Sequence, residues 1–474
     1  MQKILRNFKM ANKANGRYFV VAILLLLLCW ACEPFDEQIT NSGQARLGFS
    51  QDSVRFDTLF TSVGSITKRF KVYNPNENAV RISDVRLGQG EQSPYRITIN
   101  GDRDYRFEDE LLLGNDSLLI LVDVTIDPMD EGLPFLVKDS VLFTTNGNVQ
   151  DVKLEAFGQD AVFLGNVVLS CDELWTADKP YVLFGSVLVD SLCNLTVEEG
   201  TRIYADNGAA MFIQGTLTAR GDSASKVIFR NSRLDNSFDV APGQWGGLIF
   251  LEGSKDNLLE HVIIRNSVVG VNLNTYDEDD VPDLVMKQVL IENVSASGIL
   301  TLNSDVYAEN TLVNTCGQFV VANLGGGNYT YRHCTFANYN FLFSREVPAV
   351  VFSDNAVDNN GESITNPITT YMENTVVWGR GFNADELVID STAMQAQDYT
   401  FINNLLKADQ SLFEANGNIL NVDPIFRDVQ RYMYQPDTLS PLIDTARVSE
   451  IVRDLDGRER DQLPDIGAYE FEKE

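Results

Sequence analysis

The chain of 474 residues carries 67 acidic side chains against 37 lysines and arginines, which gives a formal net charge of −30. An excess of this size disfavours nucleic acids and anionic membrane surfaces as partners. It also disfavours polyanionic glycans, unless a local basic groove offsets the field.

The first 31 residues have the composition of a signal peptide. Residues 1–17 contain five cations and no acid, and an apolar run over 18–28 follows that is short for a membrane span. The run ends in Cys29-Trp30-Ala31-Cys32, which resembles the lipobox of bacterial lipoproteins. The resemblance implies lipidation of Cys32, which becomes the mature N-terminus. An uncleaved anchor or an ordinary secretory signal is the alternative.

The residues after Cys32 indicate where the lipoprotein is carried. Glu33, Asp36 and Glu37 resemble the surface-export signal of Bacteroidetes lipoproteins, which implies a lipid anchor in the outer membrane and a protein facing the cell exterior. Loss of the five leader cations changes the formal charge from −30 to −35. Residues 32–44 are predicted to be a polar tether.

Residues 45–160 show short alternating strands separated by turns, the pattern of a β-sandwich. The segments 56–65, 72–76 and 141–147 look like parts of the immunoglobulin-like domains of the hydin and major-sperm-protein type, in which an Asn-Pro turn follows an early strand. Domains of this kind mostly serve as spacers or interaction modules.

A short phrase recurs in the middle of the chain, at 262–266, 289–293 and 334–338, with a looser copy at 311–314. The steps from Asn to Asn are 27, 21 and 24 residues, about one coil of a parallel β-helix. Within the phrase, residues two apart are expected to face the interior, which places Val262 and Ile264 inside and Arg265 outside. Asn266 is expected at a corner, where stacked asparagines can form hydrogen bonds from coil to coil.

Further segments resemble the first coils of right-handed parallel β-helix proteins of the pectin-lyase-like superfamily, especially Bacteroidetes surface lipoproteins. These segments are 174–185, 195–204, 215–221, 227–229 and 244–250.

The resemblance assigns residues 161–420 to a right-handed parallel β-helix. Residues 421–474, which contain the phrases 423–426, 440–444, 454–458 and 465–471, resemble the closing stretch of such proteins and are expected to form the last coils and a cap. The predicted fold class is all-β: an N-terminal immunoglobulin-like β-sandwich followed by a right-handed parallel β-helix.

Four cysteines remain once the leader is removed and Cys32 is lipidated. Cys171 and Cys193 lie 22 residues apart, and a disulfide between them is predicted in an oxidising compartment. For Cys316 and Cys334, 18 residues apart, a disulfide and two buried thiols are equally good interpretations.

The candidate binding residues are few. His261 and His333 each precede an inward position of the phrase, so both are expected to point outward on one face, several coils apart. Arg265, and Trp245 as a platform for a sugar ring, complete the candidate ligand site. Coils spaced by about 4.8 Å place the histidines too far apart to bind one metal. Surface histidines without a function are the alternative.

No cofactor is expected, with one exception. Asp277, Asp279 and Asp280 form an acidic loop that is the candidate Ca²⁺ site, although the regular spacing of a calcium loop is missing. Solvated loop carboxylates are the alternative.

No catalytic constellation is recognised. The superfamily resemblance implies lyases that remove the proton next to a uronate carboxylate, commonly with a Lys or Arg base and Ca²⁺. The predicted function is therefore a non-catalytic cell-surface lipoprotein that binds a glycan or another surface partner through the β-helix. The alternative is a polysaccharide lyase or a related carbohydrate-active enzyme. The oligomeric state is not indicated.

Overall fold

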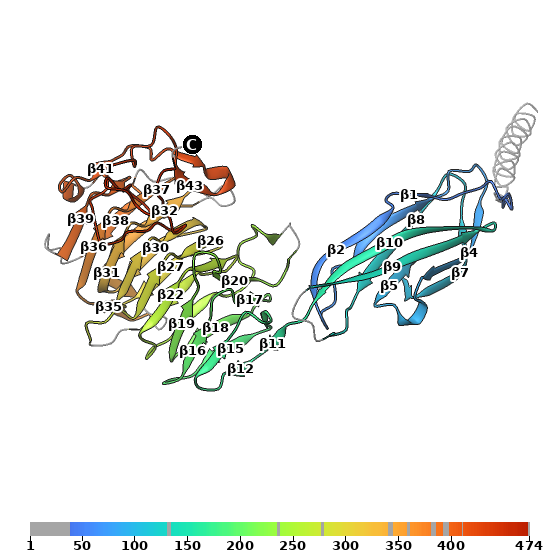
Figure 1. Cartoon of the computed structure of the whole chain (residues 1–474), viewed down its shortest axis with the longest axis horizontal. Helices are drawn as coiled ribbons and strands as arrows, with labels where there is room; N and C mark the ends of the chain where they lie inside the picture. The colour runs from blue at the N-terminus through green and yellow to red at the C-terminus, as the bar shows by residue number, and fades with distance from the viewer. Residues whose placement is uncertain are drawn as a thin grey trace, which may run out of the picture. The chain divides into compact units, whose positions relative to one another are not determined.

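The computed structural model describes residues 38–129, 134–234, 238–275, 279–339, 345–357, 361–380, 385–391, 398–409 and 411–472. The chain divides into two compact units (Figure 1). The first comprises the residues up to 56 together with 64–126 and 136–156, and the second comprises the remainder. The predicted fold class, a β-sandwich followed by a parallel β-helix, is confirmed. In the part of the chain described here, no helix is long and apolar enough to cross a bilayer.

The first unit is a sandwich of two antiparallel five-stranded sheets. Phe70 and Phe143, from opposite sheets, meet edge to face with ring centroids 6.2 Å apart. One sheet has the order β1 (Gly48–Phe49), β3 (Lys68–Tyr73), β8 (Ser117–Val124), β5 (Tyr95–Ile99) and β6 (Asp102–Asp104). The other has the order β2 (Ser53–Phe60), β10 (Asn148–Gln159), β9 (Phe135–Thr145), β4 (Val80–Leu87) and β7 (Arg106–Leu112).

The Asn-Pro turn after β3 is fixed by the side chain of Asn74. This side chain is buried, and its amide donates hydrogen bonds to the carbonyls of Asn78, Leu112 and Leu113. Buried backbone carbonyls need such partners, so the asparagine of the predicted motif connects two loops of the sandwich. A short 3₁₀ helix, η1 (Gly90–Gln92), lies in the loop between β4 and β5.

The second unit winds through three parallel sheets, so that each complete coil contributes one strand to each sheet (Figure 1). The first sheet contains β11 (Val162–Leu164), β14 (Tyr181–Leu183), β17 (Arg202–Ala205), β20 (Val227–Asn231), β23 (Val262–Arg265), β26 (Leu290–Val294), β29 (Leu312–Cys316), β32 (Thr335–Asn338), β37 (Val376–Gly379), β40 (Leu405–Leu406) and β41 (Ile419–Leu420).

The second sheet contains β12 (Val167–Val168), β15 (Ser186–Val189), β18 (Ala210–Ile213), β21 (Leu248–Phe250), β24 (Val271–Leu273), β27 (Ile299–Leu302), β30 (Val321–Leu324), β33 (Val350–Ser353) and β38 (Leu387–Asp390). The third contains β13 (Glu173–Trp175), β16 (Asn194–Val197), β19 (Thr216–Arg220), β22 (Asn257–Glu260), β25 (Leu284–Lys287), β28 (Val306–Glu309), β31 (Gly327–Arg332), β36 (Ile368–Glu373) and β39 (Tyr399–Ile402). Strands β34 (Asn355–Val357) and β35 (Ser363–Thr365) form a separate hairpin.

The recurring phrase marks successive strands of the first sheet, namely β23, β26, β29 and β32. Val262 and Ile264 belong to the interior apolar cluster, as the phrase predicts. One register is corrected: Asn314 lies beside Glu292, so Thr315 occupies the corner next to Asn293. Thr315 has a φ of 53° and Asn293 a φ of 57°, so backbone conformation, and not residue type, is repeated there.

A second corner, between the third and first sheets, consists of single residues in the left-handed conformation. Their preceding residues pair from coil to coil, so the corner residues share one register. This corner ladder comprises His261, Gln288, Asn310, His333, Asn374 and Asn403, with φ between 45° and 53°. Asparagine and histidine tolerate this conformation better than most residues, which explains their recurrence here.

A column of alternating charges lies directly before the corner ladder, on the third sheet. The residues of this charge column follow each other in register on successive coils and are Arg220, Glu260, Lys287, Glu309, Arg332 and Glu373. Ion pairs join Arg220 to Glu260 at 2.8 Å and Arg332 to Glu373 at 2.8 Å. Alternation avoids the repulsion that like charges on neighbouring strands produce.

The end of the chain forms a strap against the outer face of the first sheet. Apolar residues of 442–469 pack on outward residues such as Leu312, Val376 and Leu405. Asn374 and Asn310 of the corner ladder donate to the carbonyls of Arg447 and Arg453, both at 2.7 Å. These outward positions are apolar, so burial beneath residues 442–470, here called the C-terminal strap, is favourable. Short elements in this region of the chain are η4 (Ser411–Phe413), β42 (Phe426–Asp428), η5 (Val429–Arg431) and β43 (Met433–Pro436).

The charge column makes a testable prediction. Replacing Glu309 with lysine places three cations on successive coils and is expected to destabilise the β-helix by about 1–2 kcal/mol, since cross-strand pairs contribute roughly 0.2–1 kcal/mol each. Chemical unfolding at low and at 1 M salt measures this change. Glu309→Gln is the control, and the gap between the two variants is expected to narrow in high salt because the charges are screened. Equal stability of both variants at low salt would contradict the role assigned to alternation.

Candidate functional site

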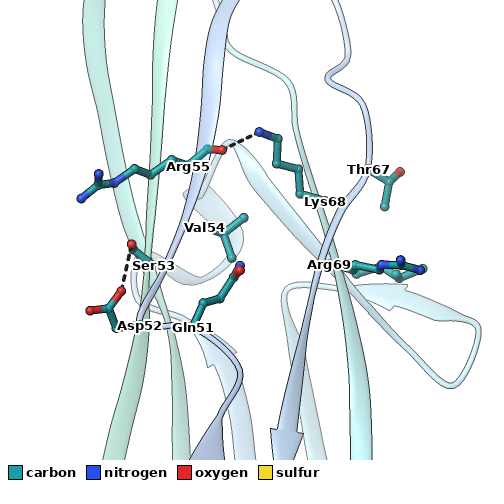
Figure 2. A pocket seen from close by; sticks show the side chains of 9 residues that line it. Gln51, Asp52, Ser53, Val54, Arg55, Thr67, Lys68 and Arg69 are labelled. Carbon is teal, nitrogen blue, oxygen red and sulfur yellow. Dashed lines mark hydrogen bonds between the residues drawn. The ribbon is translucent and has the colours of Figure 1, made fainter. Parts of the chain in front are cut away.

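Two hollows are candidate sites, and the larger of the two lies in the sandwich between β2 and β3. It measures about 890 Å³ and is lined by basic residues, including Arg55, Lys68 and Arg69 (Figure 2). Figure 2 shows Lys68 reaching across to the backbone carbonyl of Arg55, to which its ammonium donates at 2.7 Å. The guanidinium of Arg55 points away from this contact.

Strand topology explains these basic side chains. Strand β2 is an edge strand. In the other sheet, β3 is separated from the edge only by the two-residue strand β1. Lysine and other charged side chains on exposed edges prevent pairing with a foreign strand. The hollow in the sandwich therefore has a structural explanation without a ligand.

The second hollow lies on the outer face of the β-helix and measures about 360 Å³. Strands β20, β23, β26 and β29 of the first sheet form its floor, and residues after β20, around η5 and in the C-terminal strap form its walls. We call it the arginine cleft; it is lined by Arg230, Asp239, Val240, Arg265, Leu290, Glu292, Asn293, Leu312, Arg431, Tyr432 and Tyr469.

Two arginines of the cleft are stacked by strand register. Phe229 pairs with Ile264, so the residues that follow them, Arg230 and Arg265, occupy the same position on neighbouring coils. Parallel strands are about 4.8 Å apart, which brings two like charges close together. The charge column on the third sheet avoids such a pair, so the arginine cleft departs from the pattern of its own scaffold.

Carboxylates hold both guanidinium groups in place. Arg230 Nη2 lies 2.8 Å from Asp239 Oδ1, and Arg265 Nε lies 2.6 Å from Glu292 Oε1. Arg431 is the third arginine, with 81% of its side chain exposed and Asp428 at 3.6 Å. The cleft therefore gathers three arginines, each with a carboxylate partner, on a chain whose formal charge is −30.

The walls of the cleft are also fixed by hydrogen bonds. Asn266, expected to pair with asparagines of neighbouring coils, instead donates to the carbonyls of Phe238, Asp239 and Ala241. The asparagine therefore holds the loop that carries Asp239. This is a correction to the predicted asparagine ladder.

Neutral polar groups complete the lining. Asn293 is 2% exposed, and its side-chain carbonyl oxygen has no hydrogen-bond partner. Burial, followed by the negative charge of Glu292, raises the pKa of Tyr432. Burial also raises the pKa of Tyr469, so both phenols are protonated at neutral pH. The cleft thus offers guanidinium donors and phenolic side chains.

Of the predicted ligand residues, Arg265 lies in the cleft and Trp245 does not present a surface to a ligand. The indole of Trp245 is 1% exposed within the interior cluster, which corrects its prediction as a sugar platform. Its Nε1 donates to the carbonyl of Arg265 at 2.7 Å. Trp245 therefore supports the strand that carries Arg265.

The two histidines share a corner register, as predicted, but they do not form one exposed face. His333 is fully buried beneath the C-terminal strap, which corrects its prediction as a ligand residue. Its Nε2 lies 2.9 Å from Asn374 Nδ2 and 3.2 Å from Ser449 Oγ. His261 is half-buried, and burial lowers the pKa of both histidines.

The acidic loop shows no metal geometry in the part that is described. Asp277 lies outside the described residues. Asp279 accepts a hydrogen bond from the amide of Val281 at 2.8 Å and lies 3.8 Å from Lys255 Nζ, and Asp280 is exposed. Among the residues with described positions, no group of three or more His, Cys, Asp or Glu side chains could hold a metal ion.

The cysteines fall into two classes. Cys171 and Cys193 form a disulfide that joins the first two coils, with their Cα atoms 4.5 Å apart. Cys316 and Cys334 are separate, buried thiols, and burial raises the pKa of each to about 12. Such thiols are unreactive packing groups. The predicted lipid site Cys32 lies outside the described residues.

Several lining residues of the cleft were not among the predicted site residues. Arg230 follows the strand phrase 227–229, and a comparison of coils in register would have placed it beside Arg265. Arg431, Tyr432 and Tyr469 carry no such local signal, since they reach the cleft only through the fold of the C-terminal region.

No protein-family model matches the chain, and no curated protein matches it. Among solved structures, PapD-like domain 7 of human CEP192 is 12% identical and covers 27% of this chain and 93% of its own length, with a TM-score of 0.18. A family 123 glycoside hydrolase from Clostridium perfringens covers 27% of this chain and 30% of its own length at 8% identity, with a TM-score of 0.19. The E. coli chaperone DraB covers 26% and 55% at 12% identity, with a TM-score of 0.17.

The buried histidine makes a prediction about acid stability. Because the folded-state pKa of His333 is depressed, its contribution to stability is complete above the unfolded pKa of about 6.5 and is lost as the pH falls below that value. Between pH 7.5 and pH 5 the native protein is therefore expected to lose stability progressively, because the unfolded state binds a proton that the folded state does not. Asparagine occupies other positions of the corner ladder, so the His333→Asn variant is expected to fold. It is also expected to lack this loss of stability at low pH.

Urea unfolding between pH 7.5 and pH 5 compares the two proteins. The stability of the native protein is expected to fall relative to that of His333→Asn as the pH decreases. His261→Asn, at a half-buried position of the same ladder, is the control and should show a smaller pH-dependent change. Parallel pH profiles for the native protein and His333→Asn would show that His333 does not titrate in this way.

Proposed function

We propose that this protein is a lipid-anchored protein of the outer membrane, facing the cell exterior, whose β-helix binds a glycan without cleaving it. The proposal draws on two resemblances of the sequence. The coils resemble the pectin-lyase-like superfamily, and the residues after Cys32 resemble the Bacteroidetes surface-export signal. The sandwich would act as a spacer between the anchor and the β-helix.

The arginine cleft is the observation that carries the proposal. It combines guanidinium donors and phenolic side chains on the outer face of a parallel scaffold. Saccharides are recognised by polar side chains that converge on their hydroxyl groups, with aromatic side chains beside the ring. The locally positive lining also offsets the negative field of the chain, which would otherwise repel an acidic ligand.

Binding without cleavage is favoured by the chemistry of the lining. An arginine acts as a lyase base only after losing its proton, whereas Arg230 and Arg265 are held as cations by Asp239 and Glu292. The two tyrosines are also protonated, because their pKa values are raised by burial. A lyase would need a group that is ready to accept a proton from the sugar. Asp239 and Glu292, the carboxylates of the lining, are each engaged in an ion pair with an arginine, which favours binding over proton abstraction.

The lipid anchor is tested by replacing one residue. Cys32→Ser is expected to abolish incorporation of labelled fatty acid into the full chain and to leave the protein outside the membrane fraction, because the acylated thiol is lost. Cys29→Ser is the matched control and is expected to be labelled like the native protein. Labelling of Cys32→Ser at the native level would contradict lipidation at this position.

The binding site is tested by obstructing the cleft. Val240 lines it and is 43% exposed, so Val240→Trp is expected to fill the cleft and weaken glycan binding by at least about tenfold, a factor that corresponds to about 1.4 kcal/mol. Glycan arrays containing neutral and acidic polysaccharides, followed by calorimetry on the best ligand, measure this effect. Val281→Trp, on another exposed loop, is the control and is expected to bind normally.

The same polysaccharides separate binding from catalysis. Incubation with uronate polymers is expected to produce no absorbance from unsaturated products. Such absorbance, abolished by Val240→Trp, would establish the lyase in place of the binding protein. Absence of binding to every glycan would exclude the proposed function.

A further inference from the structure

The stacked arginines of the cleft call for a separate explanation. Two like charges on neighbouring coils repel each other, and each such contact destabilises a sheet. On the third sheet this repulsion is avoided, because positive and negative side chains alternate along the charge column from Arg220 to Glu373. At the first sheet it instead places Arg230 next to Arg265 and adds Arg431 from another element. An arrangement of this kind is useful where an anion is bound.

The guanidinium groups retain hydrogen-bonding capacity. Each carries five N–H donors in a fixed plane, and one carboxylate partner uses one or two of them. Arg230 contacts Asp239 through Nη2 at 2.8 Å. Arg265 contacts Glu292 through Nε, and 36% of its side chain is exposed. The carboxylates thus orient the arginines without saturating them.

We infer that the arginine cleft binds a sulfate ester on a saccharide, with the sulfate group held by Arg230, Arg265 and Arg431. This inference rests on the proposed glycan-binding function and names the ligand chemistry at the same site. A sulfate ester presents three terminal oxygens in a tetrahedral arrangement, which matches guanidinium groups supplied by three separate elements. A carboxylate presents two oxygens in one plane, which a single arginine can bind in a bidentate manner.

The remaining polar groups suit the sugar that carries the sulfate. Tyr432 lies beside the arginines and offers a phenol ring and hydroxyl group. Guanidinium is less strongly hydrated than ammonium, so it can release its water for a sulfate ester at low cost.

Three soluble polymers distinguish the anionic groups. Dextran sulfate carries sulfate without carboxylate, polygalacturonate carries carboxylate without sulfate, and dextran is neutral. With the full chain at 0.15 M salt, dextran sulfate is expected to bind at least tenfold more tightly than the other two. The net charge of −30 argues against nonspecific attraction of a polyanion, so binding would report the local site.

Charge-matched variants locate the site. Arg265→Gln and Arg230→Gln are each expected to weaken dextran sulfate binding about tenfold, whereas Arg220→Gln, which removes the same charge from the third sheet, should change it less than twofold. Because Arg265→Gln leaves the buried Glu292 without its partner, the double variant Arg265→Gln/Glu292→Gln tests binding in a protein without that unpaired charge. Thermal unfolding of each variant verifies that it is folded.

The outcomes separate the two proposals. Equal losses in Arg220→Gln and Arg265→Gln, or native affinity in the folded double variant, would overturn the sulfate site. Preferential, Arg265-dependent binding of polygalacturonate would also overturn the sulfate assignment, although it would leave glycan binding at the cleft intact. No binding to any of the three polymers would overturn the sulfate inference, and failure of the wider glycan array would then exclude the proposed function as well.

Discussion

The structure of the β-helix depends on the stacking of parallel coils in register. Each side chain lies about 4.8 Å from its counterpart on the next coil, so every column has to be compatible in size, polarity and charge. Interior columns meet this requirement with apolar residues, and the corner ladder meets it with residues that accept positive φ. The charge column meets it by alternation. The pair Arg230 and Arg265 is an exception to this alternation, and Asp239 and Glu292 hold its two guanidinium groups.

The same constraint explains the C-terminal strap. Stacking repeats outward apolar residues such as Leu312, Val376 and Leu405 along the first sheet, and the strap removes them from water. Its acidic motifs are structural: Asp454 accepts hydrogen bonds from three backbone amides, and Glu470 forms an ion pair with Arg460 at 3.0 Å. Burial raises the pKa of Asp454 and of Glu470, in keeping with carboxylates held inside the fold. The closing motifs therefore fasten the strap, and the strap in turn supplies Tyr469 to the arginine cleft.

Periodicity predicted the coils well because a strand of the β-helix is a local pattern of inward and outward residues. It assigned Val262 and Ile264 to the interior and placed His261 and His333 in one register. It misplaced Asn314 by one residue, since a looser copy of the phrase contains no information about which residue takes the corner conformation. It could not predict that His333 is buried, because the covering residue Ser449 lies 116 residues further along the chain.

The sequence by itself determined the fold class, the coil period and the inward positions, because these follow from local alternation and from the residues that turns require. Which outward residues remain accessible depends on how the C-terminal region folds over the coils. Trp245 and His333 looked like surface candidates and are buried, whereas Arg431 and Tyr432 carried no local signal and line the cleft. The physical reason is that a binding site on a β-helix combines residues of neighbouring coils with residues of distant loops. Their proximity arises from burial of the apolar outer face of the first sheet, which no single stretch of sequence specifies.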